Sequence, residues 1–209
     1  KAWDTQRGTL LYTMGPTIGQ FLRVEFTTDG QSVVSSNDES QFHIWDAASG
    51  RLIRSLPAHG SFSYQALVSP TGTHIVTIGI EGTARVWDFP ALRQARTLNG
   101  YGRGIYAAAF SRDGALFATA DMDHSARLWD LPTGRLLQTL TGHTGPLRGI
   151  EISADKKYVL TMARDNTARI WDAETGAGLI TYKFHVGGSQ SAVLVGRSQL
   201  LLGIGNEDK

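Results

Sequence analysis

Residue types that cooperate in hydrolases recur along this chain at regular spacings. Histidine stands at positions 59, 143 and 185, and the most complete set adds Thr161 and Asp165 downstream of His143. When a histidine bonds both a hydroxyl group and a carboxylate, it can act as the general base that turns the hydroxyl into a nucleophile. Taken by themselves, these residue types suggest a hydrolytic site.

The sets belong to an internal repeat. Each of the five tryptophans is followed by aspartate, and successive tryptophans are 42 residues apart, at Trp3, Trp45, Trp87, Trp129 and Trp171. A hydroxyl residue lies ten positions before four of them, at Ser35, Thr77, Thr119 and Thr161. Because several columns align on one frame, the spacing indicates a structural repeat rather than the chance recurrence of a dipeptide.

Each repeat predicts four short strands. Segments rich in β-branched and aromatic residues alternate with turn residues, and no segment has the 3.6-residue periodicity of an amphipathic helix. Ser49-Gly50 and Thr133-Gly134 offer a glycine for positive φ between two strands. Apolar pairs such as Val33-Val34 and Val159-Leu160 predict buried strands. We therefore expect an all-β chain of one domain type.

The chain resembles the WD40-repeat family over essentially all of its 209 residues. The repeat WDLPTGRLLQTLTGHTGPLRGIEISADKKYVLTMARDNTARI, followed by Trp171-Asp172, has nearly every hallmark of that family. The resemblance implies β-propeller blades, in which four-stranded antiparallel sheets pack radially about a channel. We assign the repeats to residues 3–44, 45–86, 87–128, 129–170 and 171–209, the last incomplete. A closed five-bladed ring and part of a larger ring of about seven blades both stay open, and we favour the larger ring.

The resemblance also implies a structural role for the polar sets. In the family, the corresponding histidine, hydroxyl residue, acid and tryptophan form a buried hydrogen-bonded chain, which gives the buried indole N–H an acceptor. The fourth repeat supplies it as His143, Thr161, Asp165 and Trp171, and the second as His59, Thr77, Glu81 and Trp87. The third has Tyr101 in place of histidine, and the first has Thr17, Ser35, Glu39 and Trp45. We interpret the sets as structural, because catalysis would require several active sites on one ring.

No metal or cofactor site is predicted. His43, His74 and His124 occupy three unrelated frame positions and have no partner at the i, i+4 spacing of a helical metal site. The chain has no cysteine. The segment Gly100-Tyr101-Gly102-Arg103-Gly104 is rich in glycine but lacks the spacing of a Walker or dinucleotide loop, so we interpret it as a surface loop.

Composition argues against nucleic acid and membrane partners. The formal net charge of +1 results from 20 basic and 19 acidic residues spread evenly, which leaves no field to attract polyanions. No apolar run approaches the roughly 18 residues that a membrane span needs. The absence of cysteine and of a visible signal segment in KAWDTQRGTL is compatible with the cytoplasm, which is the compartment we expect.

A candidate partner-binding face follows from the resemblance. Family proteins bind partners mostly on two loops of each repeat: the loop before the first strand and the loop just before the acidic column. Carried over by position, this face contains Phe62, Ile80, Arg103, Asp121, Met122 and Arg164. Apolar groups surrounded by arginine and acid are typical of a contact patch. Alternatively, Phe62, Ile80 and Met122 pack into the seams between blades.

These features predict a non-catalytic scaffold that binds protein or peptide partners, as part of a larger regulatory or signalling protein. The first alternative is a sensor for a small ligand or phosphorylated peptide at the channel mouth, supported by Arg103 and Arg164. A propeller enzyme is the second alternative, and no motif supports it. If the ring is unclosed, its free strand edges also favour self-association.

Overall fold

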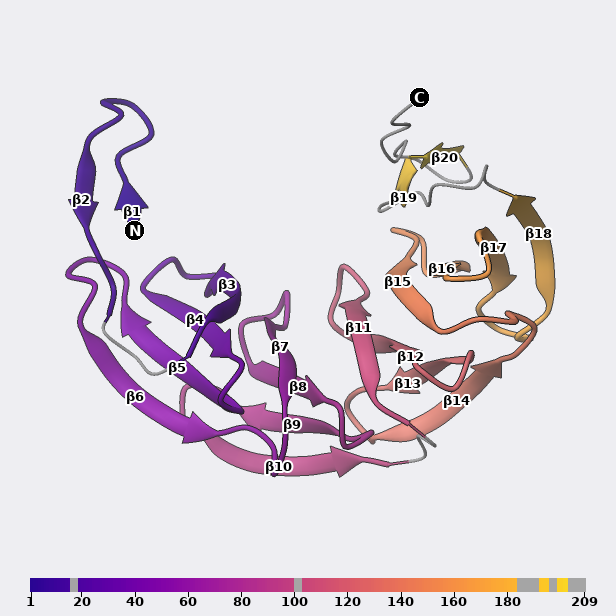
Figure 1. The fold of residues 1–209 in the computed structure, drawn as a ribbon, viewed down its shortest axis with the longest axis horizontal. Coiled ribbons are helices and arrows are strands. Elements are labelled where there is room, and N and C mark those ends of the chain that lie inside the picture. The colour runs from indigo at the N-terminus through magenta and orange to yellow at the C-terminus, as the bar shows by residue number, and fades with distance from the viewer. Residues whose placement is uncertain (16–18, 100–102, 184–191, 196–198, 203–209) are drawn as a thin grey trace. The chain divides into compact units, whose positions relative to one another are not determined.

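The computed structural model describes residues 1–15, 19–99, 103–183, 192–195 and 199–202 (Figure 1). All regular elements in these ranges are β-strands, so the prediction of an all-β chain is confirmed. None of the described residues forms a helix that is long and apolar enough to cross a membrane. The chain divides into two compact units, Lys1–Arg96 and Thr97–Lys209, which we describe separately.

Four antiparallel sheets are complete, and each contains four strands joined in chain order. The first unit holds two of them except for the last two residues of β10, made by β3 (Phe21–Phe26), β4 (Ser32–Asn37), β5 (Gln41–Asp46) and β6 (Leu52–Pro57), then by β7 (Ser63–Val68), β8 (His74–Gly79), β9 (Ala84–Asp88) and β10 (Arg93–Leu98). The second unit holds the other two, made by β11 (Ile105–Phe110), β12 (Leu116–Asp121), β13 (Ala126–Asp130) and β14 (Arg135–Leu140), then by β15 (Leu147–Ile152), β16 (Tyr158–Ala163), β17 (Thr167–Asp172) and β18 (Gly178–Lys183).

The tryptophan of every complete sheet lies on its third strand, in one constant register. Trp45 faces Val33 on the second strand, and Trp171 faces Val159 in the same way. The strand that follows each Trp-Asp pair joins the tryptophan strand. A repeat counted from its tryptophan therefore gives its first strand to one sheet and its other three strands to the next.

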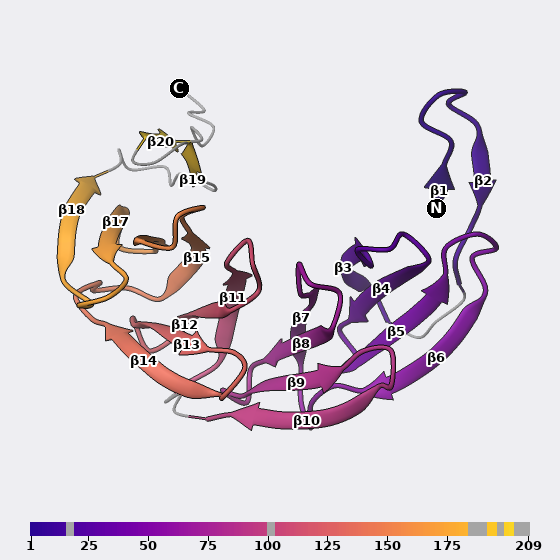
Figure 2. The ribbon, with the colours of Figure 1, turned by 180° about the vertical axis from the view of Figure 1, so that it is seen from behind.

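One short hairpin precedes the complete sheets in the chain and another follows them (Figures 1 and 2). Strands β1 (Ala2–Trp3) and β2 (Leu10–Tyr12) form a two-stranded sheet, as do β19 (Ala192–Val195) and β20 (Gln199–Leu202). Whether the ring closes depends on residues 203–209, which lie outside the described part of the chain.

The two sheets within each unit bury apolar side chains against each other. In the first unit, Val34, Phe42 and Ile44 of the first sheet form one cluster with Ala66, Val68, Ile75 and Trp87 of the second sheet. In the second unit, Ala118 and Leu128 cluster in the same way with Leu147, Val159 and Trp171. Burial of these faces is the main favourable contribution to packing, and it leaves polar groups at the strand ends to form the candidate sites.

Candidate functional site

The fourth sheet contains an uninterrupted chain of hydrogen bonds through four side chains. Trp171 on β17 donates from Nε1 to Oγ1 of Thr161 on β16 at 2.8 Å. The same hydroxyl lies 2.8 Å from Nε2 of His143, which precedes β15. His143 Nδ1 then lies 2.8 Å from Oδ2 of Asp165, in the turn after β16. The structure brings together all four residues that we grouped from the sequence.

One assignment of protons satisfies every atom of this chain. Thr161 accepts from the indole and donates to Nε2, while Nδ1–H donates to the Asp165 carboxylate. Burial lowers the pKa of His143, although the hydrogen bond and charge of Asp165 act in the opposite direction, so the imidazole is neutral as this assignment requires. Asp165 also accepts from the Thr144 backbone N–H at 2.9 Å and from the Thr167 hydroxyl at 2.7 Å.

Burial separates this arrangement from a catalytic triad. The His143 side chain is 1% exposed and Thr161 is 0% exposed. Moreover, the indole N–H of Trp171 donates to the oxygen of the Thr161 hydroxyl and so occupies a lone pair that this oxygen would need for nucleophilic attack. A substrate cannot reach the oxygen without opening the sheet, and the geometry therefore supports a structural role for the set.

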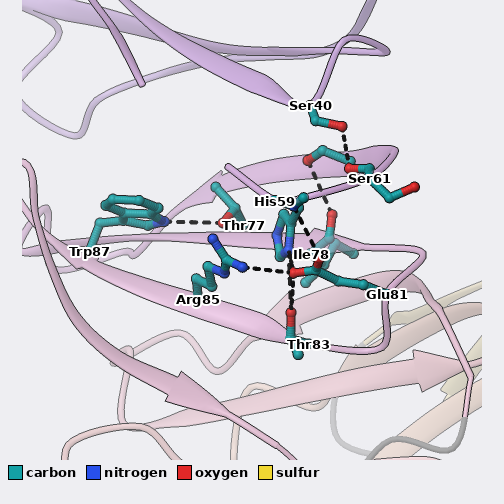
Figure 3. Close-up of polar contacts among 11 residues, drawn as sticks. Ser40, His59, Ser61, Thr77, Ile78, Glu81, Thr83, Arg85 and Trp87 are labelled. Carbon is teal, nitrogen blue, oxygen red and sulfur yellow. Dashed lines mark hydrogen bonds and ion pairs between the residues drawn. The ribbon is translucent and has the colours of Figure 1, made fainter. Parts of the chain in front are cut away.

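The second sheet repeats this chain with one gap (Figure 3). Trp87 donates to Thr77 at 3.1 Å, and His59 Nδ1 lies 2.8 Å from Glu81 Oε1. Among the described residues, however, His59 Nε2 has no hydrogen-bond partner although it is buried. Burial alone would raise the pKa of Glu81, but hydrogen bonds from His59, Thr83 and the backbone of Gly60 outweigh it and lower that pKa to about 2.

The third sheet replaces the chain with a buried cluster of one arginine and two carboxyl groups. Arg127 on β13 bonds Asp121 Oδ2 through Nη1 and bonds Asp123 Oδ2 at 2.8 Å through Nη2. Within the described ranges, Asp121 Oδ1 and the Thr119 hydroxyl are buried without a hydrogen-bond partner. Burial raises the pKa of Asp121 to about 7, against the attraction of Arg127. Tyr101, which replaces histidine here, lies outside the described residues.

The first sheet builds its network from a residue that sequence reasoning set aside. Trp45 donates to Ser35 at 2.8 Å as expected, but Glu39 is exposed and does not supply a buried acid. Instead, buried His43 on β5 bonds the Ser55 hydroxyl at 2.8 Å through Nδ1 and the Asn37 amide at 3.3 Å through Nε2. Thr17 and His185 lie outside the described residues. His43 stands at the frame position that holds arginine in three other repeats, Arg85, Arg127 and Arg169. This departure from the column was the signal that could have revealed the network of the first sheet.

A recurring backbone hydrogen bond joins the two loops of the candidate binding face. The N–H of Ile80 donates to the carbonyl of Phe62 at 2.9 Å, and Arg164 donates to Pro146 at 2.9 Å. Met122 and Asp38 make the equivalent bonds to Gly104 and Gln20 in their own sheets. In every complete sheet, the loop before the first strand is thus bonded to the residue immediately before the acid position.

The residues assigned to this face differ in exposure. Ile80 is 43% exposed, Arg103 and Arg164 are exposed, and Phe62 and Met122 are half-buried. In the first unit, the Phe62 ring packs edge-on against Tyr64, with ring centroids 5.1 Å apart. Phe62 and Ile80 belong to the first unit, whereas Arg103, Met122 and Arg164 belong to the second.

Asp121 must be removed from the face, because its side chain is 0% exposed and paired with Arg127. The resemblance placed it on the loop just before the acidic column, but it is the last residue of β12 and its side chain is buried. For metals, the described residues contain no group of three or more histidine, aspartate or glutamate side chains able to hold an ion.

Comparison with known proteins defines the family. The family model described as WD domain, G-beta repeat, matches residues 50–88, 92–130 and 134–172, which together exceed half of the chain. The chain therefore belongs to the WD40 family, whose repeats form protein-interaction scaffolds and are generally non-enzymatic.

A curated relative matches a shorter segment. The chain is 34% identical over 59 residues to autophagy-related protein 16 of Arabidopsis thaliana. The matched segment is 28% of this chain and covers 12% of that protein.

Proposed function

We propose that this chain is the non-catalytic recognition part of a larger regulatory or signalling protein and binds a protein or peptide through the loop edges of its sheets. The observation that carries the proposal is Ile80, a large apolar side chain left 43% exposed beside Phe62 and fixed to it by a backbone bond. An apolar group held on a rigid frame loses little entropy when it is covered, so it is suited to anchor a partner.

The polar sets support the same proposal by their burial. The hydroxyl, histidine and acid residues of the second and fourth sheets are bonded within the sheets, and the histidine side chains are 0% and 1% exposed. Their hydrogen bonds rigidify the loops that carry the exposed residues. Glu81, which follows Ile80, bonds both His59 and the backbone of Gly60, which precede Phe62.

A second candidate function is recognition of an anionic ligand, such as a phosphorylated peptide. Arg103 and Arg164 are both exposed on loop edges of the second unit. Guanidinium groups bind phosphate through two parallel N–H donors. If this function holds, binding to Arg164 should require the phosphate, and dephosphorylation of the partner should abolish it.

Affinity capture with matched variants tests the proposal. The wild-type chain, Ile80→Glu, Arg164→Glu and the control Ile53→Glu, whose residue is 52% exposed on β6, are immobilised and exposed to the same cell extract. The partner should be enriched by the wild type and the control and lost with Ile80→Glu or Arg164→Glu. A protein captured equally by all four chains, or no enriched protein at all, would contradict the proposal.

A further inference from the structure

An aspartate holds the turn between the first and second strands of three complete sheets. Asp29, Asp113 and Asp155 stand at one position of the 42-residue frame. Each carboxylate accepts from the hydroxyl group two positions earlier, at 2.6–2.8 Å, and from the backbone N–H two positions later, at 3.0–3.2 Å. These three turns therefore share one arrangement, in which two donors face a carboxylate.

The donors of this turn favour a negative charge. The pKa of Asp29 lies below its ordinary value of 3.8, chiefly because the Thr27 hydroxyl donates to the carboxylate. The Ser153 hydroxyl lowers the pKa of Asp155 in the same way. A lowered pKa means that the turn stabilises the ionised form over the neutral one. The frame position is thus built to hold an anion.

The turn of the second sheet keeps the hydroxyl donor but has no acid. Thr71 replaces the aspartate, in the turn between β7 and β8. Ser69 supplies the buried hydroxyl group, which accepts from the N–H of His74 at 3.0 Å. Within the described ranges, Thr71 bonds only hydroxyl groups, those of Ser69 at 3.1 Å and Thr73 at 2.7 Å. This turn therefore lacks the anion that the other three contain.

The side chains around Thr71 can donate to an anion and are open to solvent. Thr71 and Thr73 are both exposed. The Thr73 hydroxyl lies 2.9 Å from Nδ1 of His74, whose side chain is 28% exposed. When His74 donates from Nδ1, the Thr73 hydroxyl is left to donate toward position 71. Asp88, the acid beside His74, is itself bonded to Arg93 at 2.8 Å.

We propose that Thr71 is a phosphorylation site and that its phosphate takes the place of the missing aspartate. The phosphate accepts from the hydroxyl groups of Ser69 and Thr73 and from the backbone N–H of Thr73, as the carboxylates of the other turns accept from their donors. A phosphate group carries about −1.5 to −2 charges at pH 7 and has three acceptor oxygens, so it satisfies these donors at least as well as a carboxylate. This modification goes beyond the proposed function and does not depend on it.

The transfer requires a nucleoside triphosphate and a protein kinase. The hydroxyl oxygen of Thr71 forms a bond to the terminal phosphorus of the triphosphate, and the bond from that phosphorus to the bridging oxygen breaks, which releases the nucleoside diphosphate. The hydroxyl proton passes to a carboxylate of the kinase. Thr71 is suited as the acceptor because its hydroxyl lies in an exposed turn, whereas that of Ser69 is buried.

Phosphate transfer with matched variants tests the site. The wild-type chain, Thr71→Ala and the control Thr73→Ala are incubated with a panel of purified serine/threonine kinases and ATP labelled in its terminal phosphate. At least one kinase should label Thr71 in the wild type, as located by peptide mass spectrometry. The label should be lost in Thr71→Ala and retained in Thr73→Ala, and melting curves verify that both variants fold. Absence of label on Thr71 with every kinase would overturn the proposal.

The placement of the phosphate has a separate test. Chains that carry phosphothreonine at position 71 or, as the control, at position 73 are made by genetic incorporation. Phosphate at position 71 should raise the melting temperature by about 2–4 °C and move the amide proton of Thr73 downfield in the NMR spectrum. Thr71→Asp should act in the same direction, and its neutral counterpart Thr71→Asn should not.

An unchanged or lower melting temperature with phosphate at position 71, or an unmoved Thr73 amide proton, would overturn the claim that the phosphate replaces the aspartate. The control at position 73 should give no stabilisation, because the other turns hold no acid at the corresponding residues, Gln31, Ala115 and Lys157. Equal stabilisation by both phosphates would contradict a specific site at Thr71. None of these changes touches Phe62, Ile80 or Arg164, so failure here leaves the loop-face proposal standing.

Discussion

Nε2 of His143 lies 2.8 Å from the Thr161 hydroxyl, whereas Nε2 of His59, at the equivalent position two repeats earlier, is buried without a partner among the described residues. Both histidines keep a 2.8 Å contact to an acid through Nδ1. The two copies of the motif therefore differ in the bond between the hydroxyl and the histidine, so the contribution of this bond can be compared within the same protein.

We expect His143→Ala to lower the free energy of unfolding by about 1–3 kcal/mol, because it leaves the buried Thr161 hydroxyl without its acceptor and removes one of the donors to Asp165. His59→Ala should cost less, since Nε2 of His59 makes no hydrogen bond that could be lost among the described residues. Urea denaturation of both variants beside the wild type makes the comparison. Equal and negligible losses would refute the network interpretation.

The stabilising effect of His143 should depend on pH. Burial lowers the pKa of His143 below its ordinary value of 6.5, so the unfolded chain takes up a proton more readily than the folded chain. The contribution is therefore complete above pH 6.5 and is lost as the pH falls below it. Melting temperatures of the wild type and His143→Asn at pH 8 and pH 5 should differ more at pH 8. A difference in melting temperature that is larger at pH 5 than at pH 8 would contradict this prediction.

Much of the fold could be predicted from the sequence, because the 42-residue frame determines strand order and register together. The hydroxyl column, together with the resemblance, predicted the bonds from Trp45, Trp87 and Trp171. These features repeat, so each copy supports the assignment of the others.

The parts that could not be predicted are those where one repeat departs from the frame. Asp121 replaces small residues, Gly79 and Ala163, that stand at its frame position in two other repeats, and nothing in the spacing shows that Arg127 turns toward it. His43 likewise stands where three repeats have arginine. The exposure of a loop residue also depends on neighbouring side chains that a repeat frame does not fix.

Asp121 should make the third sheet less stable as the pH rises. Burial raises its pKa from 3.8 to about 7, so the folded chain holds a proton that the unfolded chain has released. The free energy of unfolding should therefore fall between about pH 4 and pH 7. Asp121→Asn, which places there the residue found as Asn37 in the first repeat, should remove this slope. A wild type and variant with parallel stability curves would contradict the assignment.

Gly145 should tolerate no side chain. A Cβ atom there would lie 2.8 Å from the backbone nitrogen of Asp165 and 3.1 Å from the backbone carbon of Arg164. Gly145→Ala should therefore displace the acid and lower the melting temperature by several degrees. Gly60→Ala is the matched control, because its Cβ would meet only the Glu81 carboxylate at 3.4 Å. Equal melting temperatures for the two variants would refute the steric argument.

The central claim is that the repeated hydroxyl, histidine and acid residues stabilise sheets rather than perform catalysis, and a double-mutant cycle tests it most directly. The free energy of unfolding is measured for Thr161→Val, His143→Ala and the double variant, with Thr77→Val and His59→Ala as the matched cycle. We predict a coupling energy of about 0.5–3 kcal/mol between Thr161 and His143 and a smaller one between Thr77 and His59. Additive effects in the first cycle would show that the Thr161–His143 bond does not hold the fourth sheet together and would contradict the claim.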